Sequence, residues 1–234
     1  MVIERYQKYG MNIKKSIELL TRSLPAGCSL IAVSKTQPLE KIMEAYDAGQ
    51  RIFGENKAQE LTQKYAQLPK DIEWHMIGHL QTNKVKYIAP FVHLIHSVDS
   101  LKLLQEIDKQ GKKNNRVINC LLQIHIAEED TKFGFSETEL WDMLPSAEFA
   151  TLQNIKVTGL MGMATLTVDK NKIRKEFQSL KSLFEKLKSA SWPKNIAMKE
   201  LSIGMSSDYQ LAAEEGSTMV RIGTAIFGER NYLP

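Results

Sequence analysis

Short apolar runs alternate with longer polar stretches along the whole chain. Eight such runs occur, at residues 30–34, 51–54, 74–78, 92–97, 117–124, 157–163, 199–204 and 219–228. Each of the first seven leads into a segment with the spacing of an amphipathic helix. Buried strands that alternate with helices in this way are typical of a parallel sheet with helices packed against it.

The number of strand–helix units and the chain length together predict the fold class, which is α/β. The economical closure for eight strands in 234 residues is a single (β/α)8 TIM barrel, a fold that typically takes about 250 residues. A doubly wound open sheet is the alternative, because periodicity alone does not show closure. Ile13, Ile17 and Leu20 predict an extra N-terminal helix before the first strand. No Pro/Gly/Ser-rich linker interrupts the sequence, so we expect one domain over residues 1–234.

Two predicted helices carry recognisable capping signals. Ser136 and Glu139 form a capping-box pattern at the start of one of them. Asp99 is expected to cap another, with Gly111 after its last residue.

Composition and charge indicate which kinds of ligand or macromolecule the protein could bind. Hydrophobic residues make up 43% and charged residues 25% of the chain, as in ordinary globular proteins. The formal charge of +4 is spread out, and its densest basic run, residues 109–116, is typical of solvated helix ends. We therefore expect no nucleic-acid surface, although an anionic small ligand would suit the mild positive balance.

Cysteine usage and the lack of targeting signals bear on the compartment. Cys28 and Cys120 lie far apart without metal-ligand spacing, so they are expected to be reduced thiols. The N-terminus does not have the pattern of a signal peptide. No stretch approaches the ~18 consecutive apolar residues of a membrane span. A cytoplasmic protein with no membrane segment is the expectation.

The ends of the predicted strands carry the candidate chemistry, since the carboxyl ends of barrel strands converge on one face. Lys35 follows the first strand, where partial desolvation lowers the pKa of a lysine amine and favours a Schiff base with an aldehyde. The alternative is a lysine that reaches the surface or pairs with a carboxylate. Asn56 follows the second strand, where it could cap the next helix, hydrogen-bond a ligand oxygen, or do both.

Two turns after the seventh and eighth strands suit a phosphate group. Ser206 offers a hydroxyl and backbone N–H groups at a helix N-terminus. Gly223 allows close approach of the backbone, and Thr224 adds a hydroxyl. Loops at these two positions form the usual phosphate site of the barrel. Arg221 shares a strand face with Gly223 and is expected to point inward beneath the ligand, with a salt bridge inside the barrel as the alternative.

A Schiff-base lysine that faces a phosphate cradle calls for an aldehyde that carries a phosphate. Pyridoxal 5′-phosphate (PLP) meets both requirements and is the predicted cofactor. His75 and His79 lie four residues apart, but residues 74–77 are predicted as strand, so the two do not share a helix face. No metal site is therefore predicted.

Ordered motifs cover most of the chain, from about residue 32 to residue 230. They are AVSKTQP, FGENKAQE, WHMIGHLQTNK, HSVD, TKFGF, GLMGMA, SIGMSSD and VRIGTAIFGER. Taken together, they resemble the pyridoxal phosphate homeostasis proteins, the YggS/PROSC family. The resemblance implies a barrel similar to the N-terminal domain of alanine racemase, as in fold-type III PLP enzymes.

The same resemblance implies a role for each candidate residue. Lys35 would carry PLP as an internal aldimine. Ser206, Gly223 and Thr224 would hold the phosphate, and Asn56 would lie near the cofactor ring.

Arg221 would face the pyridine nitrogen, where a cation disfavours protonation and weakens the ring as an electron sink.

Racemisation needs a base on each face of the substrate α-carbon. In alanine racemase the second base is a tyrosine of a C-terminal β-domain, whereas this chain ends at Pro234 and offers Tyr209 as a candidate. We expect a non-catalytic PLP carrier that buffers or delivers the cofactor, with no catalytic residue; a PLP-dependent racemase is the alternative.

A third class is an aldolase-like barrel that uses a Schiff-base lysine without a cofactor. It would need acid–base carboxylates at the mouth. Glu55 is the only clear candidate near Lys35, with an orientation away from the mouth as the alternative if it lies at a helix start. For the carrier, the expected partners are PLP and PLP-dependent apoenzymes as recipients. The expected oligomeric state is a monomer.

Overall fold

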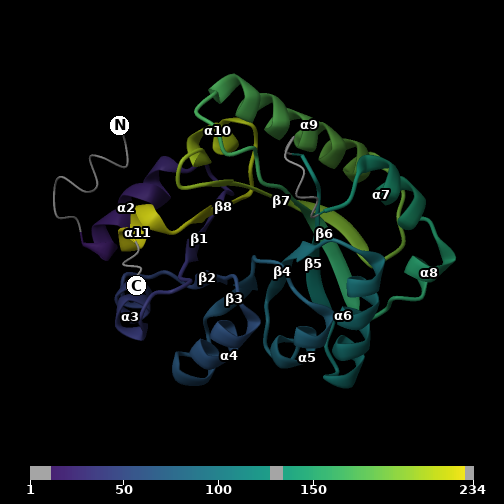
Figure 1. Cartoon of the computed structure of the whole chain (residues 1–234), viewed down its shortest axis with the longest axis horizontal. Coiled ribbons are helices and arrows are strands. Elements are labelled where there is room, and N and C mark those ends of the chain that lie inside the picture. Colours follow the sequence, from purple (N-terminus) through teal and green to yellow (C-terminus); the bar gives the residue numbers. More distant parts are fainter. Residues whose placement is uncertain (1–11, 127–133, 230–234) are drawn as a thin grey trace.

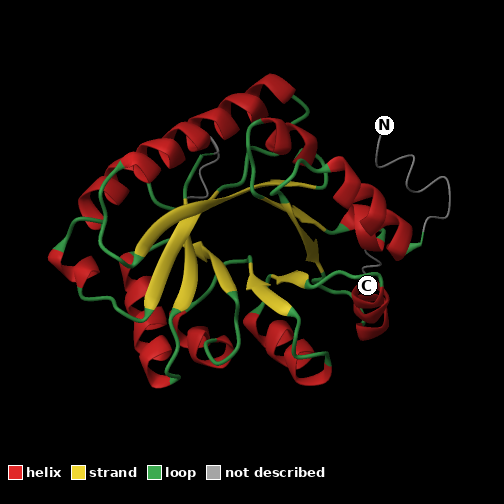
Figure 2. Cartoon of the chain, turned by 180° about the vertical axis from the view of Figure 1, so that it is seen from behind, coloured by secondary structure: helices red, strands yellow, loops and turns green. Residues whose placement is uncertain are grey.

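Eight parallel strands close into a barrel, and helices surround it (Figures 1 and 2). The computed structural model describes residues 12–126 and 134–229. Each strand pairs with its neighbours in chain order, and β8 pairs with β1. The predicted TIM barrel is confirmed, and the open doubly wound sheet is wrong. Most of the TKFGF motif lies outside the described residues.

The strands correspond closely to the eight apolar runs. They are β1 (Ser29–Val33), β2 (Ile52–Glu55), β3 (Glu73–Met76), β4 (Leu94–Val98), β5 (Ile118–Gln123), β6 (Ile155–Met161), β7 (Ile196–Met205) and β8 (Met219–Ile222). The helices are α2 (Ile13–Ser23), α3 (Leu39–Asp47), α4 (Ala58–Gln67), η1 (Thr82–Lys84, a 3₁₀ helix), α5 (Val85–Ile88), α6 (Leu101–Lys113), α7 (Glu137–Met143), α8 (Ala147–Ala150), α9 (Lys170–Ser189), α10 (Tyr209–Glu214) and α11 (Thr224–Phe227).

The hydrophobic core has two parts, because successive strand residues point to opposite faces of the sheet. The larger part lies between the strands and the helices and includes Leu30, Phe53 and Trp74. The smaller part lies inside the barrel, where Leu94, Leu121 and Met161 pack together. The apolar runs are nearly continuous because both strand faces are buried.

Closure of the barrel joins the first strand to the last. In the β1–β8 pair, Ile31 lies opposite Arg221 and Ala32 opposite Ile222. The turns that follow these two strands therefore meet at the same rim of the barrel. Gly223 packs there so closely that an added Cβ would lie 3.0 Å from the backbone oxygen of Val33.

The extra N-terminal helix is confirmed as α2. It begins after Asn12, whose side chain accepts a hydrogen bond from the backbone N–H of Lys15 at 2.9 Å. Its buried face contains Ile13, Ile17 and Leu20. This face packs near α3 and α11, next to the β1–β8 junction (Figure 1).

Two of the predicted helix boundaries are wrong, whereas the capping box of Ser136 is confirmed. The cap of α6 is Ser100 rather than Asp99, because its hydroxyl accepts the backbone N–H of Leu103 at 3.3 Å. Gly111 lies inside α6 rather than after it. A Cβ at Gly111 would lie 2.6 Å from the backbone oxygen of Asn154, so the glycine is required by close packing and not by a helix end.

The eighth apolar run also divides differently from the prediction. The strand ends at Ile222, and the rest of the run forms the short helix α11. α9 is the longest of the described helices, and it is amphipathic, with Phe177 and Phe184 on its buried face. None of the described helices is both long and apolar enough to cross a bilayer.

Candidate functional site

A cavity of about 380 Å³ opens where the carboxyl ends of the strands converge. It brings together all of the residues that the sequence singled out, which are Lys35, Asn56, Ser206, Arg221, Gly223 and Thr224. Its remaining walls are made by Val33, Ile77, Met163, Met205 and Ser207. Sequence reasoning missed the apolar members of this set, although Val33 and Ile77 have the strand parity of inward-facing residues.

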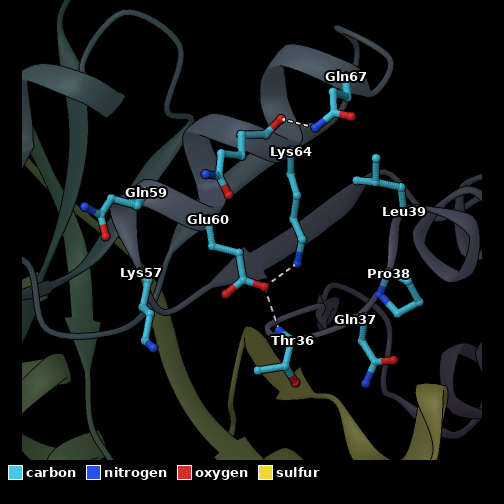
Figure 3. A pocket seen from close by; sticks show the side chains of 10 residues that line it. Thr36, Gln37, Pro38, Leu39, Lys57, Gln59, Glu60, Lys64 and Gln67 are labelled. Carbon is cyan, nitrogen blue, oxygen red and sulfur yellow. Dashed lines mark hydrogen bonds and ion pairs between the residues drawn. The ribbon is translucent and has the colours of Figure 1, made fainter.

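The turn that carries Lys35 is tied to the neighbouring helix on both sides of the lysine. The Ser34 hydroxyl donates to Glu55 Oε1 at 2.6 Å, and the Ser34 carbonyl accepts from Lys64 Nζ at 2.8 Å. On the other side, the Thr36 backbone N–H donates to Glu60 Oε1 at 2.6 Å (Figure 3). These bonds hold the backbone around a half-buried Lys35.

Thr36 has a positive φ of 64°, which a β-branched residue rarely adopts. The bond from its N–H to Glu60 holds this unfavourable conformation. A groove of about 800 Å³ lies on this outer side of the turn, lined by residues of α4 and by Thr36 (Figure 3). The groove is larger than the cavity at the barrel mouth, but it contains none of the predicted site residues.

The anchor of this turn is a buried ion pair between Glu55 and Lys64. Their side chains are 0% and 6% exposed, and Lys64 Nζ lies 2.8 Å from Glu55 Oε1. Burial raises the pKa of the Glu55 carboxyl, and the ammonium group of Lys64 opposes that rise. Lys64 also donates to Glu60 at 2.7 Å (Figure 3).

This arrangement decides between the alternatives for two residues at the end of the second strand. Glu55 faces Lys64 of α4 and does not line the cavity, so it is not placed to serve as the acid–base group of an aldolase-like site. Asn56 is not the cap of α4, which begins after Lys57 without a side-chain cap. Asn56 instead lines the cavity, as the ligand-binding alternative predicted.

The turns after β7 and β8 are joined by a hydrogen bond. The backbone N–H of Gly223 donates to Ser206 Oγ at 3.3 Å. A hydroxyl that accepts one bond can still donate its own proton, so Ser206 is left able to bind an anion. Thr224 and Ser207 add two more hydroxyls to the same wall.

Arg221 lies at the bottom of the cavity with its guanidinium buried in the barrel. It donates to the backbone oxygen of Ser202 at 2.8 Å, to the Ser202 hydroxyl at 2.6 Å and to the backbone oxygen of Gly162 at 2.9 Å. Burial lowers the pKa of Arg221 to about 10, and the nearby Asp208 opposes the shift. Arg221 therefore stays cationic at neutral pH. The inward orientation is confirmed, and the groups that hold it are neutral oxygens rather than a carboxylate.

Two buried histidines, which the sequence analysis did not connect to the site, continue this network. His96 Nδ1 lies 3.0 Å from Ser202 Oγ, and His96 Nε2 lies 2.9 Å from His75 Nδ1. Burial lowers the pKa of His75 to about 3 and that of His96 well below its ordinary value. Both imidazoles are therefore neutral at physiological pH. His79, the residue with which His75 was compared, instead lies 3.2 Å from Asp99.

The chemistry of the described lining suits an anion that also carries a flat apolar group. Lys35 and Arg221 are its charged members, and no carboxylate lines the cavity among the described residues. Hydroxyl donors occupy one wall, and Val33, Ile77 and two methionines supply apolar surface. A phosphate and an aromatic ring could be held side by side in such a cavity.

Comparison with known sequences agrees with this description. Residues 11–231 match the family model "Alanine racemase, N-terminal domain". The pyridoxal phosphate homeostasis protein of Aquifex aeolicus is 41% identical, with 98% of each chain covered. The human protein of that name is 38% identical, with 94% of this chain and 83% of the relative covered.

Solved structures give the same result. PipY of Synechococcus elongatus, without PLP, is 36% identical and superposes with a TM-score of 0.87, covering 93% of this chain and all (100%) of that one. Its structure with PLP bound gives a TM-score of 0.84 at the same identity and coverage. Alanine racemase from Bartonella henselae, at 15% identity, shares the fold, with a TM-score of 0.68 over 94% of this chain and 60% of that one.

The fold and the lysine at its mouth define a barrel of the alanine racemase N-terminal type. Within that class, the chain belongs to the family of pyridoxal phosphate homeostasis proteins.

The buried ion pair makes a prediction about stability. Lys64→Met should lower the free energy of unfolding by about 3–5 kcal/mol at neutral pH, because it leaves the Glu55 carboxylate buried without its counter-ion. The loss should be smaller near pH 5. Without Lys64 the pKa of Glu55 rises further, so the folded state holds a proton that the unfolded state releases. The free energy of unfolding therefore falls as the pH increases above the usual pKa of a glutamate. Denaturant unfolding at the two pH values measures both effects.

The matched control is the double variant Glu55→Gln/Lys64→Met, which removes the ionisable carboxyl and should remove the added pH dependence. An equal loss of stability at both pH values in Lys64→Met would show that Glu55 is not the group responsible.

Proposed function

We propose that this chain binds pyridoxal 5′-phosphate at the carboxyl mouth of the barrel and acts in the homeostasis of that cofactor, as a carrier that buffers or delivers it. One observation carries the proposal, namely that a lysine and a set of phosphate-type donors line the same cavity. The names of the relatives and the PLP-bound PipY structure support the same ligand.

Lys35 is the residue to which we assign the covalent bond. When bound, PLP supplies an aldehyde that reacts with a primary amine. Among the described residues that line the cavity, Lys35 is the only one with such an amine. Its backbone is held by the bonds of Ser34 and Thr36 to α4, so the amine is presented from a fixed turn.

The opposite wall is assigned to the phosphate. Ser206 and Thr224 can donate hydroxyl protons, and the loop at Gly223 allows a phosphate oxygen to approach the backbone. The bond from Gly223 to Ser206 holds the two turns at a fixed separation. Asn56 is assigned to the neighbourhood of the ring, where its amide can donate to a ring substituent.

Arg221 is assigned to the ring nitrogen. Its guanidinium is cationic and is fixed by three hydrogen bonds. A fixed cation at that nitrogen disfavours its protonation, and an unprotonated ring withdraws electrons weakly. This favours holding the cofactor over using it for catalysis.

The lack of a second base also supports a carrier over a racemase. Within the described part of the cavity wall, Lys35 and Arg221 are the titratable side chains, and arginine does not act as a base. Tyr209, the candidate from the sequence, is 5% exposed and packs in the hydrophobic core outside the cavity.

We further propose that residues 1–234 act as one monomeric domain in the cytoplasm, with PLP-dependent apoenzymes as recipients.

Replacement of the lysine should separate covalent attachment from folding. Lys35→Ala should abolish covalent trapping of PLP by borohydride, because no other amine lines the described cavity wall. The variant should keep the unfolding midpoint of the parent, since Lys35 lies at the mouth. Peptide mass spectrometry after reduction locates the modified lysine, and Lys57→Ala, on an exposed neighbouring lysine, is the matched control. Undiminished trapping in Lys35→Ala would contradict the assignment.

Loss of the Ser206 hydroxyl should weaken phosphate binding selectively. Ser206→Ala should lower PLP affinity by about 1–3 kcal/mol, because one donor is lost while backbone donors remain. Equilibrium titration measures the change. The affinity for pyridoxal, which has no phosphate, should stay the same and serves as the control. An equal effect on both ligands would place Ser206 outside the phosphate site.

The carrier proposal predicts no significant racemisation. PLP-loaded protein should not interconvert L- and D-alanine at a rate comparable with alanine racemase, because the described residues of the cavity wall include no base for the second face of the substrate. Chiral chromatography of the reaction mixture measures the conversion. Turnover that disappears in Lys35→Ala would establish the racemase alternative.

A further inference from the structure

Three potential metal ligands meet at the amino end of the barrel, opposite the cavity. Glu73 begins β3, His75 projects from the same strand, and His93 immediately precedes β4. Each offers one ligand atom, and these atoms all lie within 4.8 Å of one another. We propose that Glu73, His75 and His93 form a binding site for a divalent transition-metal ion of the zinc type.

One ring nitrogen of His75 is buried without a hydrogen-bond partner. Its Nδ1 is taken by His96 at 2.9 Å, whereas its Nε2 is buried and has no hydrogen-bond partner. The residue is 1% exposed, so bulk water does not satisfy this nitrogen. A buried polar atom without a partner is unfavourable in either tautomer, as a donor or as an acceptor. An ion bound at Nε2 would remove that penalty.

The other two ligands are exposed enough to rotate toward a bound ion. His93 and Glu73 are half-exposed, at 47% and 45%, and His93 Nε2 lies 3.6 Å from Glu73 Oε2. The rings of His75 and His93 are stacked with centroids 5.5 Å apart. Zinc bonds of 2.0–2.1 Å place tetrahedral ligand atoms about 3.3 Å apart, so the two exposed side chains need to rotate and bring their ligand atoms closer to His75. Two histidines and a carboxylate, with an open fourth position for water, are a known ligand set for zinc.

His75 already has an outer hydrogen bond of the kind that orients metal ligands. An ion at Nε2 requires the His75 proton to be on Nδ1, from which it is donated to His96 Nε2. His96 then carries its own proton on Nδ1 and donates it to Ser202 Oγ, at 3.0 Å. Ser202 Oγ also accepts from Arg221, at 2.6 Å, so an ion at Nε2 would fix the tautomers of both histidines in the network that leads to Arg221.

The expectation of no metal site considered His75 with His79. It did not include His93, which comes from the next strand and becomes a neighbour only when β3 and β4 pair. His79 lies beside a single carboxylate, Asp99, at 3.2 Å. That pair therefore provides a matched control, because His79 is an exposed histidine beside a carboxylate and belongs to no three-ligand cluster among the described residues.

The test is calorimetric titration of chelator-treated protein with Zn²⁺, without added PLP. The parent should bind one equivalent tightly, and its melting temperature should rise with Zn²⁺ concentration because the ion binds the folded state. Glu73→Gln and His93→Asn should each weaken binding by at least about tenfold. His79→Asn should bind like the parent. Both ligand substitutions are at half-exposed side chains, so the variants should fold.

A second measurement reads the tautomer directly. In ¹⁵N-histidine NMR spectra, Zn²⁺ should shift the Nε2 resonance of His75 and leave the proton on Nδ1. Zinc binding that is equal in parent, Glu73→Gln and His93→Asn, or that is lost in His79→Asn, would overturn the proposal. No tight binding by the parent would also overturn it and would leave Glu73 and His93 as a surface ion pair.

Discussion

Closure of the sheet between β1 and β8 is the constraint on which the site depends. Register in that pair places Ile31 opposite Arg221, so the turn carrying Lys35 lies beside the turn carrying Gly223 and Thr224. These residues come from opposite ends of the sequence, and no local interaction would bring them together. A parallel barrel converts one repeated strand–helix unit into a ring of converging turns, and each turn contributes one or two side chains to a shared cavity.

The barrel combines this geometry with buried charged side chains. Lys64 is buried beneath the Lys35 turn, and Arg221 is buried beneath the cavity. Buried charges contribute little net stability, since desolvation offsets much of the attraction. What they provide is position: Lys64 bonds to Ser34, Glu55 and Glu60, and so connects the turn to two elements at once. The amine of Lys35 is thereby presented from a backbone that has little freedom to move.

The sequence was sufficient to predict the fold and the cavity residues that carry candidate chemistry, but not the apolar lining or the contacts between side chains. Lys35 and Ser206 could be found because each follows an apolar run, and strand ends converge in any closed parallel sheet. The pairing of His96 with His75 could not be found, because it depends on the stagger between strands inside the barrel. The predicted cap of α6 was wrong for a local reason. Ser100 and Asp99 are adjacent residues with equal capping ability, and the entry angle of the chain decides between them.

The charge inside the barrel has a consequence for how ligands arrive. Arg221 is a fixed cation in a low-dielectric interior, its hydrogen-bond partners are neutral oxygens, and Lys35 stands above it at the mouth. Field lines from such a buried charge are focused through the opening, which raises the local concentration of small anions and speeds their encounter with the barrel. This attraction is indifferent to the identity of the anion and is screened by salt. Discrimination between anions must therefore come after encounter, from the reaction of an aldehyde with the lysine and from the spacing between that lysine and the hydroxyl wall.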